Sequence, residues 1–243
     1  ELTTILESNK YRLGGSADTV STDGGSTSYL YEQGTNLTLH PITDAGLVGY
    51  WTFDEGTGTQ ALDSSGNNNT GTWQGTLGSQ WTTGKIGGAG NFNGINNDVV
   101  IGNNGVLNFN ATNLTISSWF YISNYQEHQR IVMADGYLYG FKVTTNQIVG
   151  AVNNVWTGSA TIPVNNGYWV FGTVVFRRDL NTVSFYVNGL YSGDYNITFS
   201  TMNPSSIHIG GYGYLLNGLI DDVRIYNRAL SPAEILSIYN ATK

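Results

Sequence analysis

The sequence contains no cysteine and few charged residues, and both absences restrict what the protein can be. Without Cys it has no disulfide framework, no thiolate zinc site and no thiol nucleophile. Charged residues make up 11% of the chain, less than half of the roughly 25% usual for globular domains. Its polarity comes instead from Asn, Thr, Ser and 32 Gly, a composition that favours turns and neutral hydrogen-bonding surfaces.

Basic residues are also scarce, and long apolar runs are missing. Ten Lys and Arg stand against 17 Asp and Glu, which gives a net charge of −7. This balance argues against a nucleic-acid partner, because phosphate binding requires clustered basic residues. No apolar run approaches the roughly 18–20 residues of a membrane helix, so no membrane span is predicted. The 243 residues are 40% apolar, which is enough for a sizeable core.

The first 45 residues differ in character from the rest. They include "GGSADTVSTDGGSTSY", which is rich in Gly, Ser, Thr and Asp and is typical of a loop. We therefore predict an N-terminal extension or linker over residues 1–45 and one domain over residues 46–243.

From Leu47 onward, apolar residues alternate with period two, which indicates β-strands. The runs "LTISSWFYI", "YWVFGTVVF" and "VSFYVNG" are the clearest, and Asn188-Gly189 predicts a hairpin turn. Short strands separated by Gly and Asn turns predict an all-β fold, a two-sheet antiparallel jelly-roll sandwich. One short C-terminal helix is also expected in "SPAEILSIYN", with Ser231 as N-cap, Pro232 at the first helical position and Glu234 completing a capping box. Its Ile235, Leu236 and Tyr239 are expected to pack on the sandwich.

Several of these runs resemble a known family. "LVGYWTFDEGTGTQALDSSGNNNTGT", "GKIGGAGNFNG", "LTISSWFYI" and "LIDDVRIYNRALSPAEI" look like the LamG-like jelly-roll domains of the concanavalin A-like lectin/glucanase superfamily. The resemblance spans roughly Leu47 to Tyr239. In one place the sequence departs from the family: Asn93 stands where an acidic residue is usual.

The resemblance implies a lectin-like, non-catalytic module of extracellular proteins that binds glycans or cell-surface proteins, often with a structural calcium ion. Residues 1–40 are also similar to the segment that follows the helix in type IV pilin-like proteins ("LESNKYRLGG", "VSTDGG", "YEQGTNLTL"). We therefore expect an adhesion or glycan-recognition module on a bacterial surface. The alternative is a structural or protein-interaction subunit of a pilus-like filament, and a third hypothesis is a glycoside-active enzyme.

The acidic residues give little support to the enzyme hypothesis. Glucanases of this superfamily resemble one another in an E-x-D-x-x-E strand, and the sequence has no such run. Asp54-Glu55 and Asp221-Asp222 are adjacent pairs, so on a strand their side chains point to opposite faces. His40, His128 and His208 have no recognisable nucleophile nearby. We therefore predict no catalytic residues.

A calcium loop is one interpretation of "DSSGNNN". Asp63, Ser65, Asn67 and Asn69 place oxygen donors at positions one, three, five and seven, the spacing used in Ca²⁺ loops. A second carboxylate is needed, and Asp221 is the candidate because alternation directs it to an apolar face, where an unpaired charge is costly. Family resemblance would bring the two together. In the alternative interpretation, Asp63 and Asp221 only accept hydrogen bonds from turn amides.

Aromatic side chains in turn-rich segments are the candidates for glycan binding. Sugars stack on exposed rings, and loops at the ends of a sandwich often carry sites. Trp51 is expected in the core. The candidate ligand-binding residues are Trp73, Trp81, Trp156, Tyr212 and Tyr214.

Overall fold

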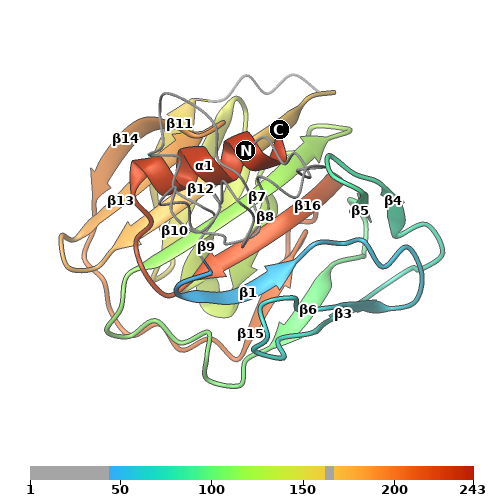
Figure 1. The fold of residues 1–243 in the computed structure, drawn as a ribbon, viewed down its shortest axis with the longest axis horizontal. Helices are drawn as coiled ribbons and strands as arrows, with labels where there is room; N and C mark the ends of the chain where they lie inside the picture. The colour runs from blue at the N-terminus through green and yellow to red at the C-terminus, as the bar shows by residue number, and fades with distance from the viewer. Residues whose placement is uncertain (1–43, 162–166) are drawn as a thin grey trace, which may run out of the picture. The chain divides into compact units, whose positions relative to one another are not determined.

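The computed structural model describes residues 44–161 and 167–243 (Figure 1). The predicted N-terminal extension, apart from its last two residues, and the pilin-like resemblance lie outside the described residues. Within them, two antiparallel sheets and one α-helix confirm the predicted all-β sandwich. No helix in these two ranges is long and apolar enough to cross a bilayer.

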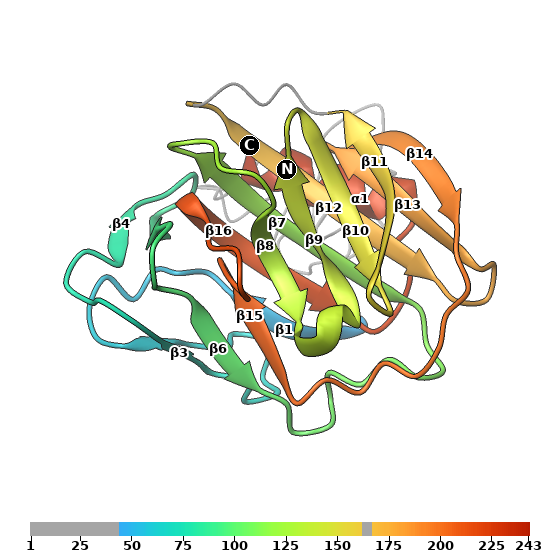
Figure 2. The same cartoon turned by 180° about the vertical axis from the view of Figure 1, so that it is seen from behind.

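The two sheets are built from strands that are far apart in sequence (Figures 1 and 2). The first sheet has the order β14 (Leu190–Asn196), β13 (Thr182–Val187), β12 (Trp169–Arg177), β7 (Leu114–Ile122), β16 (Asn217–Tyr226), β5 (Gly88–Asn93) and β4 (Trp81–Thr83), and β1 (Leu47–Trp51) also pairs with β16. The second has the order β11 (Val155–Thr161), β10 (Gln147–Val152), β9 (Tyr139–Thr144), β8 (Gln129–Ala134), β15 (Ser206–Ile209), β6 (Val99–Gly102), β3 (Gly71–Trp73) and β2 (Gln60–Ala61). A short 3₁₀ helix, η1 (Asp135–Tyr137), links β8 to β9.

Alternation along β7 divides its side chains between two apolar layers. Ile116 and Phe120 belong to the large core cluster, whereas Trp119 packs in a second cluster with Phe171 and Ile238. Successive side chains of a strand point to opposite faces, so this strand is buried on both sides. Trp51 is fully buried in the large core, as predicted.

The predicted turn and helix are both present. Asn188 and Gly189 have φ of 50° and 78°, the left-handed values that a tight hairpin requires. Helix α1 (Pro232–Thr242) begins after the N-cap Ser231 with a complete capping box to Glu234. It covers the outer face of the first sheet (Figure 1).

The contact face of α1 differs in part from the prediction. Ile235 is buried and Tyr239 packs against the second cluster, as expected. Leu236, however, is 39% exposed, and Ile238 is buried in its place. A helix face repeats every three to four residues, so Ile238 and not Leu236 follows Ile235 onto the sheet.

Candidate functional site

The outer face of the second sheet carries a cluster of cationic and aromatic side chains. Trp156 lies opposite Ala151, which lies opposite Gly140. The two residues beside the indole on the neighbouring strands therefore have a small side chain or none. Arg130 of β8 and Lys142 of β9 are direct register partners in the same face. Directly opposed residues of an antiparallel pair share a face and lie close together. Strands β8 to β11 run side by side in Figure 2.

Arg130 is the centre of this cluster. Its guanidinium carbon lies 4.7 Å from the ring centroid of Tyr137, 4.7 Å from that of Tyr214 and 5.8 Å from that of Trp156. These are cation–π distances. The residue is only 2% exposed, and burial lowers the pKa of its guanidinium. We call Arg130, Lys142, Tyr137, Trp156, Tyr212 and Tyr214 the Arg130 cluster.

Lys142 is the second cation of the cluster. Its ammonium lies 3.6 Å from the centroid of Trp156 and 3.0 Å from Nδ1 of His128. Burial lowers the pKa of Lys142, and the charge of Arg130 lowers it further. Two like charges therefore lie together on this face, and aromatic rings partly cover them.

The backbone around the cluster is held in uncommon conformations. His128 and Tyr137 have φ of 65° and 55°, and Tyr212 has φ of 119°, a value that residues with a side chain rarely adopt. The Arg130 guanidinium donates a hydrogen bond to the Tyr212 carbonyl. Such conformations cost of order 1–3 kcal/mol each and are concentrated at functional sites. The three segments that contain these residues are therefore formed at some expense in stability.

His208 links the cluster to the next strand. Its Nδ1 lies 2.7 Å from a carboxylate oxygen of Asp98, and its ring centroid lies 4.9 Å from that of Tyr212. Its Nε2 lies 3.1 Å from the hydroxyl of Ser206. His208 therefore supports the Tyr212 ring.

The structure brings together three of the five predicted ligand-binding aromatics. Trp156, Tyr212 and Tyr214 all belong to the Arg130 cluster, and Trp156 and Tyr214 are 37% and 50% exposed. Trp73 does not join them, because it is 3% exposed and packs in the core. Trp81 is half-buried against Trp73, with ring centroids 5.6 Å apart. The expectation of an exposed Trp73 was wrong, because β3 directs it inward with Phe92.

Sequence reasoning missed the two cations. Both Arg130 and Lys142 stand in strands whose alternate residues are core-facing, namely Ile131 in β8 and Phe141 in β9. Period two therefore predicts a common outer face for them. Their alignment with each other depends on strand pairing, which no local pattern reveals.

The predicted calcium loop is held together by its own carboxylate. Asp63 accepts hydrogen bonds from the amides of Tyr50 (2.9 Å), Ser65 (2.9 Å) and Asn69 (2.8 Å). Asn67 bonds Ser65 with its side-chain amide, and the Asn69 amide group donates to the Val48 carbonyl. These bonds are those of a turn-forming Asp.

Asp221 has different partners. It is 1% exposed, and one carboxylate oxygen accepts a hydrogen bond from the Ile86 amide at 2.9 Å. Asp54 approaches the same turn and accepts a bond from the Gly88 amide at 2.6 Å. The structure thus gives Asp63 and Asp221 separate partners and places Asp54, not Asp63, beside the loop that Asp221 contacts.

Burial and charge make Asp221 an unusual carboxylate. Burial raises the pKa of Asp221 to about 7, the Ile86 and Lys85 amides oppose this rise, and the charges of Asp222 and Asp54 add to it. A Cβ on Gly84 would stand 2.7 Å from the Asp221 carboxylate, so the absence of a side chain at Gly84 lets Asp221 approach this turn. The two carboxylates are oxygen donors of the kind that Ca²⁺ prefers.

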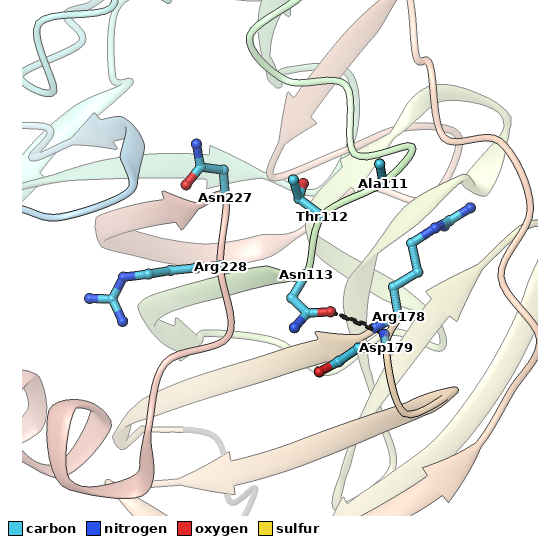
Figure 3. A pocket seen from close by; sticks show the side chains of 7 residues that line it. All are labelled: Ala111, Thr112, Asn113, Arg178, Asp179, Asn227 and Arg228. Carbon is cyan, nitrogen blue, oxygen red and sulfur yellow. Dashed lines mark hydrogen bonds between the residues drawn. The ribbon is translucent and has the colours of Figure 1, made fainter.

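A separate cavity of about 520 Å³ lies where three loops meet (Figure 3). Its lining is Ala111, Thr112, Asn113, Arg178, Asp179, Asn227 and Arg228. Asn113 accepts a hydrogen bond from the Arg178 amide at 2.8 Å. The lining includes no aromatic ring, so it offers no stacking surface of the kind found in the Arg130 cluster.

Comparison with known families identifies the chain. The profile described as "Concanavalin A-like lectin/glucanases superfamily" (Laminin_G_3) matches residues 93–236, more than half of the chain. The chain belongs to the concanavalin A-like lectin/glucanase superfamily. A search among curated proteins found no match.

Several solved structures share this fold. Domain 4 of AbnA, an extracellular arabinanase from Geobacillus stearothermophilus solved with arabinotriose, is 20% identical, with a TM-score of 0.64; the match covers 81% of this chain and 100% of that domain. The binding domain of Paraclostridial Mosquitocidal Protein 1 is 19% identical, with a TM-score of 0.66; the match covers 83% of this chain and 53% of that one.

The receptor-binding domain of botulinum neurotoxin C/D mosaic serotype is 16% identical, with a TM-score of 0.65. That match covers 82% of this chain and 52% of the toxin chain. This superfamily member therefore spans about half the length of the toxin binding domains. These likenesses establish the fold and leave the ligand to be argued from the site.

Proposed function

We propose that the protein is a non-catalytic, extracellular glycan-binding module and that the Arg130 cluster is its binding site. The proposal is supported by superfamily membership and by the similarity to binding domains, one of which was solved with arabinotriose. The acidic residues also favour a binding role. Asp54, Glu55 and Asp63 each accept hydrogen bonds from backbone amides, which is a structural use of a carboxylate.

One observation carries the proposal: Trp156 and Tyr214 present partly exposed rings that both lie against the buried Arg130 guanidinium. Sugars bind proteins through ring faces that stack on their C–H groups, together with a few well-placed polar groups. Large rigid aromatic rings provide such contact area at low conformational cost. In the Arg130 cluster these rings come from β11 and from the loop between β15 and β16. That loop contains Tyr212, whose φ of 119° is uncommon for a residue with a side chain.

The test is a glycan array with the full chain, followed by titration of the best ligand. We expect Trp156→Ala and Tyr214→Ala each to weaken binding by about tenfold, the usual effect of truncating a central aromatic anchor. The matched control is Tyr168→Ala, because Tyr168 is 65% exposed and has no role in the cluster. Binding that is unchanged in both cluster variants would contradict the placement of the site.

The same experiment separates the alternatives. Binding to no glycan would favour a structural or protein-interaction subunit of a surface filament. Release of sugar from a bound polysaccharide would favour a glycoside-active enzyme. Display on a pilus-like filament would be tested by locating the full-length protein on cells with an antibody to the domain.

We also propose that a structural Ca²⁺ binds between Asp54 and Asp221, at the turn formed by residues 84–88. The residues fit a cation because two carboxylates approach one turn and burial disfavours the charge of Asp221, a cost that the Ile86 and Lys85 amides offset only in part. A bound cation would neutralise this charge and tie the turn to β16. Chelation should then lower the melting temperature without changing the glycan preference.

A further inference from the structure

The Arg130 cluster carries more positive charge than its surroundings balance. The chain has only ten Lys and Arg against 17 acidic residues. Even so, Arg130 and Lys142 are 2% and 5% exposed and lie directly opposite each other across β8 and β9. Like charges that face each other in a sheet are destabilising. Burial of both adds a desolvation penalty.

No carboxylate of the described residues forms an ion pair with either cation. The ion pairs found in residues 44–161 and 167–243 join Arg224 to Asp222 and Arg228 to Glu234, and His208 contacts Asp98. The Arg130 Nε is buried and has no hydrogen-bond partner. Arg130 thus retains an unused hydrogen-bond donor on its guanidinium. The planar guanidinium is the group whose geometry matches a carboxylate or sulfate.

We propose that the ligand of this site is an acidic sugar, whose oxyanion binds Arg130 and Lys142 while its ring stacks on Trp156 or Tyr214. This inference rests on the proposed glycan-binding function and names the class of glycan. An oxyanion would accept a hydrogen bond from the free Nε–H of Arg130. Its negative charge would also offset the repulsion between the charges of Arg130 and Lys142. The carboxylate of a uronic or sialic acid and the sulfate of a sulfated sugar share this chemistry.

The positions of the rings are compatible with entry of such a group. Trp156 lies on β11, the edge strand of the second sheet, and Tyr214 lies in a loop; neither ring belongs to either apolar cluster. The nearby Asp98 is already bonded to His208. The charge of Glu127 raises the pKa of Lys142, but burial and the charge of Arg130 have larger effects and lower it.

The experiment compares the affinity of the full chain for matched pairs of oligosaccharides. Oligogalacturonide is paired with its methyl ester, sialyllactose with lactose, and a sulfated galactan oligomer with its desulfated form. We expect at least one acidic member to bind about tenfold or more tightly than its neutral partner, with an affinity that falls as salt is added. The pair that binds distinguishes a carboxylate from a sulfate.

Two variants test the two cations. Arg130→Gln and Lys142→Met should reduce binding of the acidic sugar about tenfold, to the level of its neutral partner, and abolish most of the salt dependence. The matched controls are Arg178→Gln and Lys85→Met, because neither residue belongs to the Arg130 cluster. Arg178 lines a separate cavity, and the Lys85 ammonium lies 4.9 Å from the ring centroid of Trp119. Thermal melting confirms that each variant is folded.

The outcomes separate the two proposals. Equal binding of acidic and neutral sugars, lost in Trp156→Ala, would overturn the acidic ligand and leave the glycan-binding function intact. Acidic-sugar binding that survives both cluster variants but is lost in Arg178→Gln would overturn the site. Binding of no sugar would overturn both proposals. If Arg130→Gln does not fold, Lys142→Met alone decides the outcome, since an unchanged preference for the acidic sugar would overturn the inference.

Discussion

The Lys142 ammonium lies 3.6 Å from the centre of the Trp156 indole ring, so this cation is in direct contact with an aromatic face. The two residues are on different strands, β9 and β11, with β10 between them. Because Lys142 is buried, the contact is screened from water and should be stronger than an exposed cation–π pair.

A double-mutant cycle will measure this contact. We expect Lys142→Met and Trp156→Leu to show a coupling energy of about 0.5–2 kcal/mol in urea unfolding, because each substitution removes the same cation–π pair. As a control, Lys85→Met and Trp156→Leu should be additive within about 0.5 kcal/mol, because Lys85 stacks on Trp119. Equal coupling in both cycles would show that the pair is not special.

The pKa of Asp221 predicts an unusual dependence of stability on pH. Burial raises this pKa to about 7 from an ordinary value of 3.8. Between these values the folded state holds a proton that the unfolded state has lost, so the contribution of Asp221 to stability falls as pH rises from about 4 to 7. In EDTA, Asp221→Asn should therefore raise the melting temperature at pH 8 by several degrees, roughly 2–4 °C per kcal/mol, and have little effect at pH 4.

Calcium should reverse this result if the proposed Asp54–Asp221 site binds it. Millimolar Ca²⁺ should raise the melting temperature of the wild type at pH 8 and leave Asp221→Asn unchanged. Asp63→Ala serves as the control: it should lower the melting temperature equally with Ca²⁺ and with EDTA, because Asp63 bonds the amides of its own turn and of Tyr50. Loss of the calcium response in Asp63→Ala instead would support the Asp63–Asp221 pairing suggested by family resemblance.

A buried ion pair beside the proposed cation site should be costly to break. Arg224 bonds Asp222 at 2.8 Å and the Tyr50 hydroxyl at 2.9 Å, and Tyr50 donates to Asp222 at 2.6 Å. Burial alone would lower the pKa of Arg224, but the neighbouring Asp222 and Tyr50 outweigh it and raise the pKa. Arg224→Met should cost about 3–5 kcal/mol in chemical denaturation, because it leaves the buried Asp222 carboxylate without a counter-charge, with the Tyr50 hydroxyl still bonded to it.

The double variant Arg224→Met with Asp222→Asn tests that explanation. It should recover part of the loss, because the uncompensated charge is then gone. A double variant no more stable than Arg224→Met would mean that lost packing, and not the lone charge, causes the effect.

The capping box of α1 should contribute to stability in a pH-dependent way. Burial tends to raise the pKa of Glu234, but its bonds to Arg228 and to Ser231 lower it to about 2. The contribution is therefore present above the ordinary value of 4.5 and is lost as pH falls toward 2. Glu234→Gln should cost roughly 0.5–1 kcal/mol at pH 7 and nearly nothing at pH 2, measured by thermal melting. A loss that is the same at both pH values would assign the effect to packing.

The sequence alone determined the features that depend on neighbouring residues. Period two along Leu114–Ile122 and Trp169–Arg177 predicted strands, and Asn188-Gly189 predicted the hairpin turn that joins β13 to β14. The capping box at Ser231 predicted the start of the helix. Each of these depends on local backbone preference or on side-chain alternation, so a single stretch of chain contains all the information required.

The tertiary structure decided which distant residues meet. Pairing of β8 with β9 placed Arg130 opposite Lys142, and the β15–β16 loop brought Tyr214 over Arg130. The same long-range packing moved Trp73 into the core and gave Asp221 the turn at Ile86 as its partner. Alternation identifies the face on which a side chain lies, but only strand order and register determine its neighbours across the sheet. The proposed site, the Arg130 cluster, is made of such neighbours.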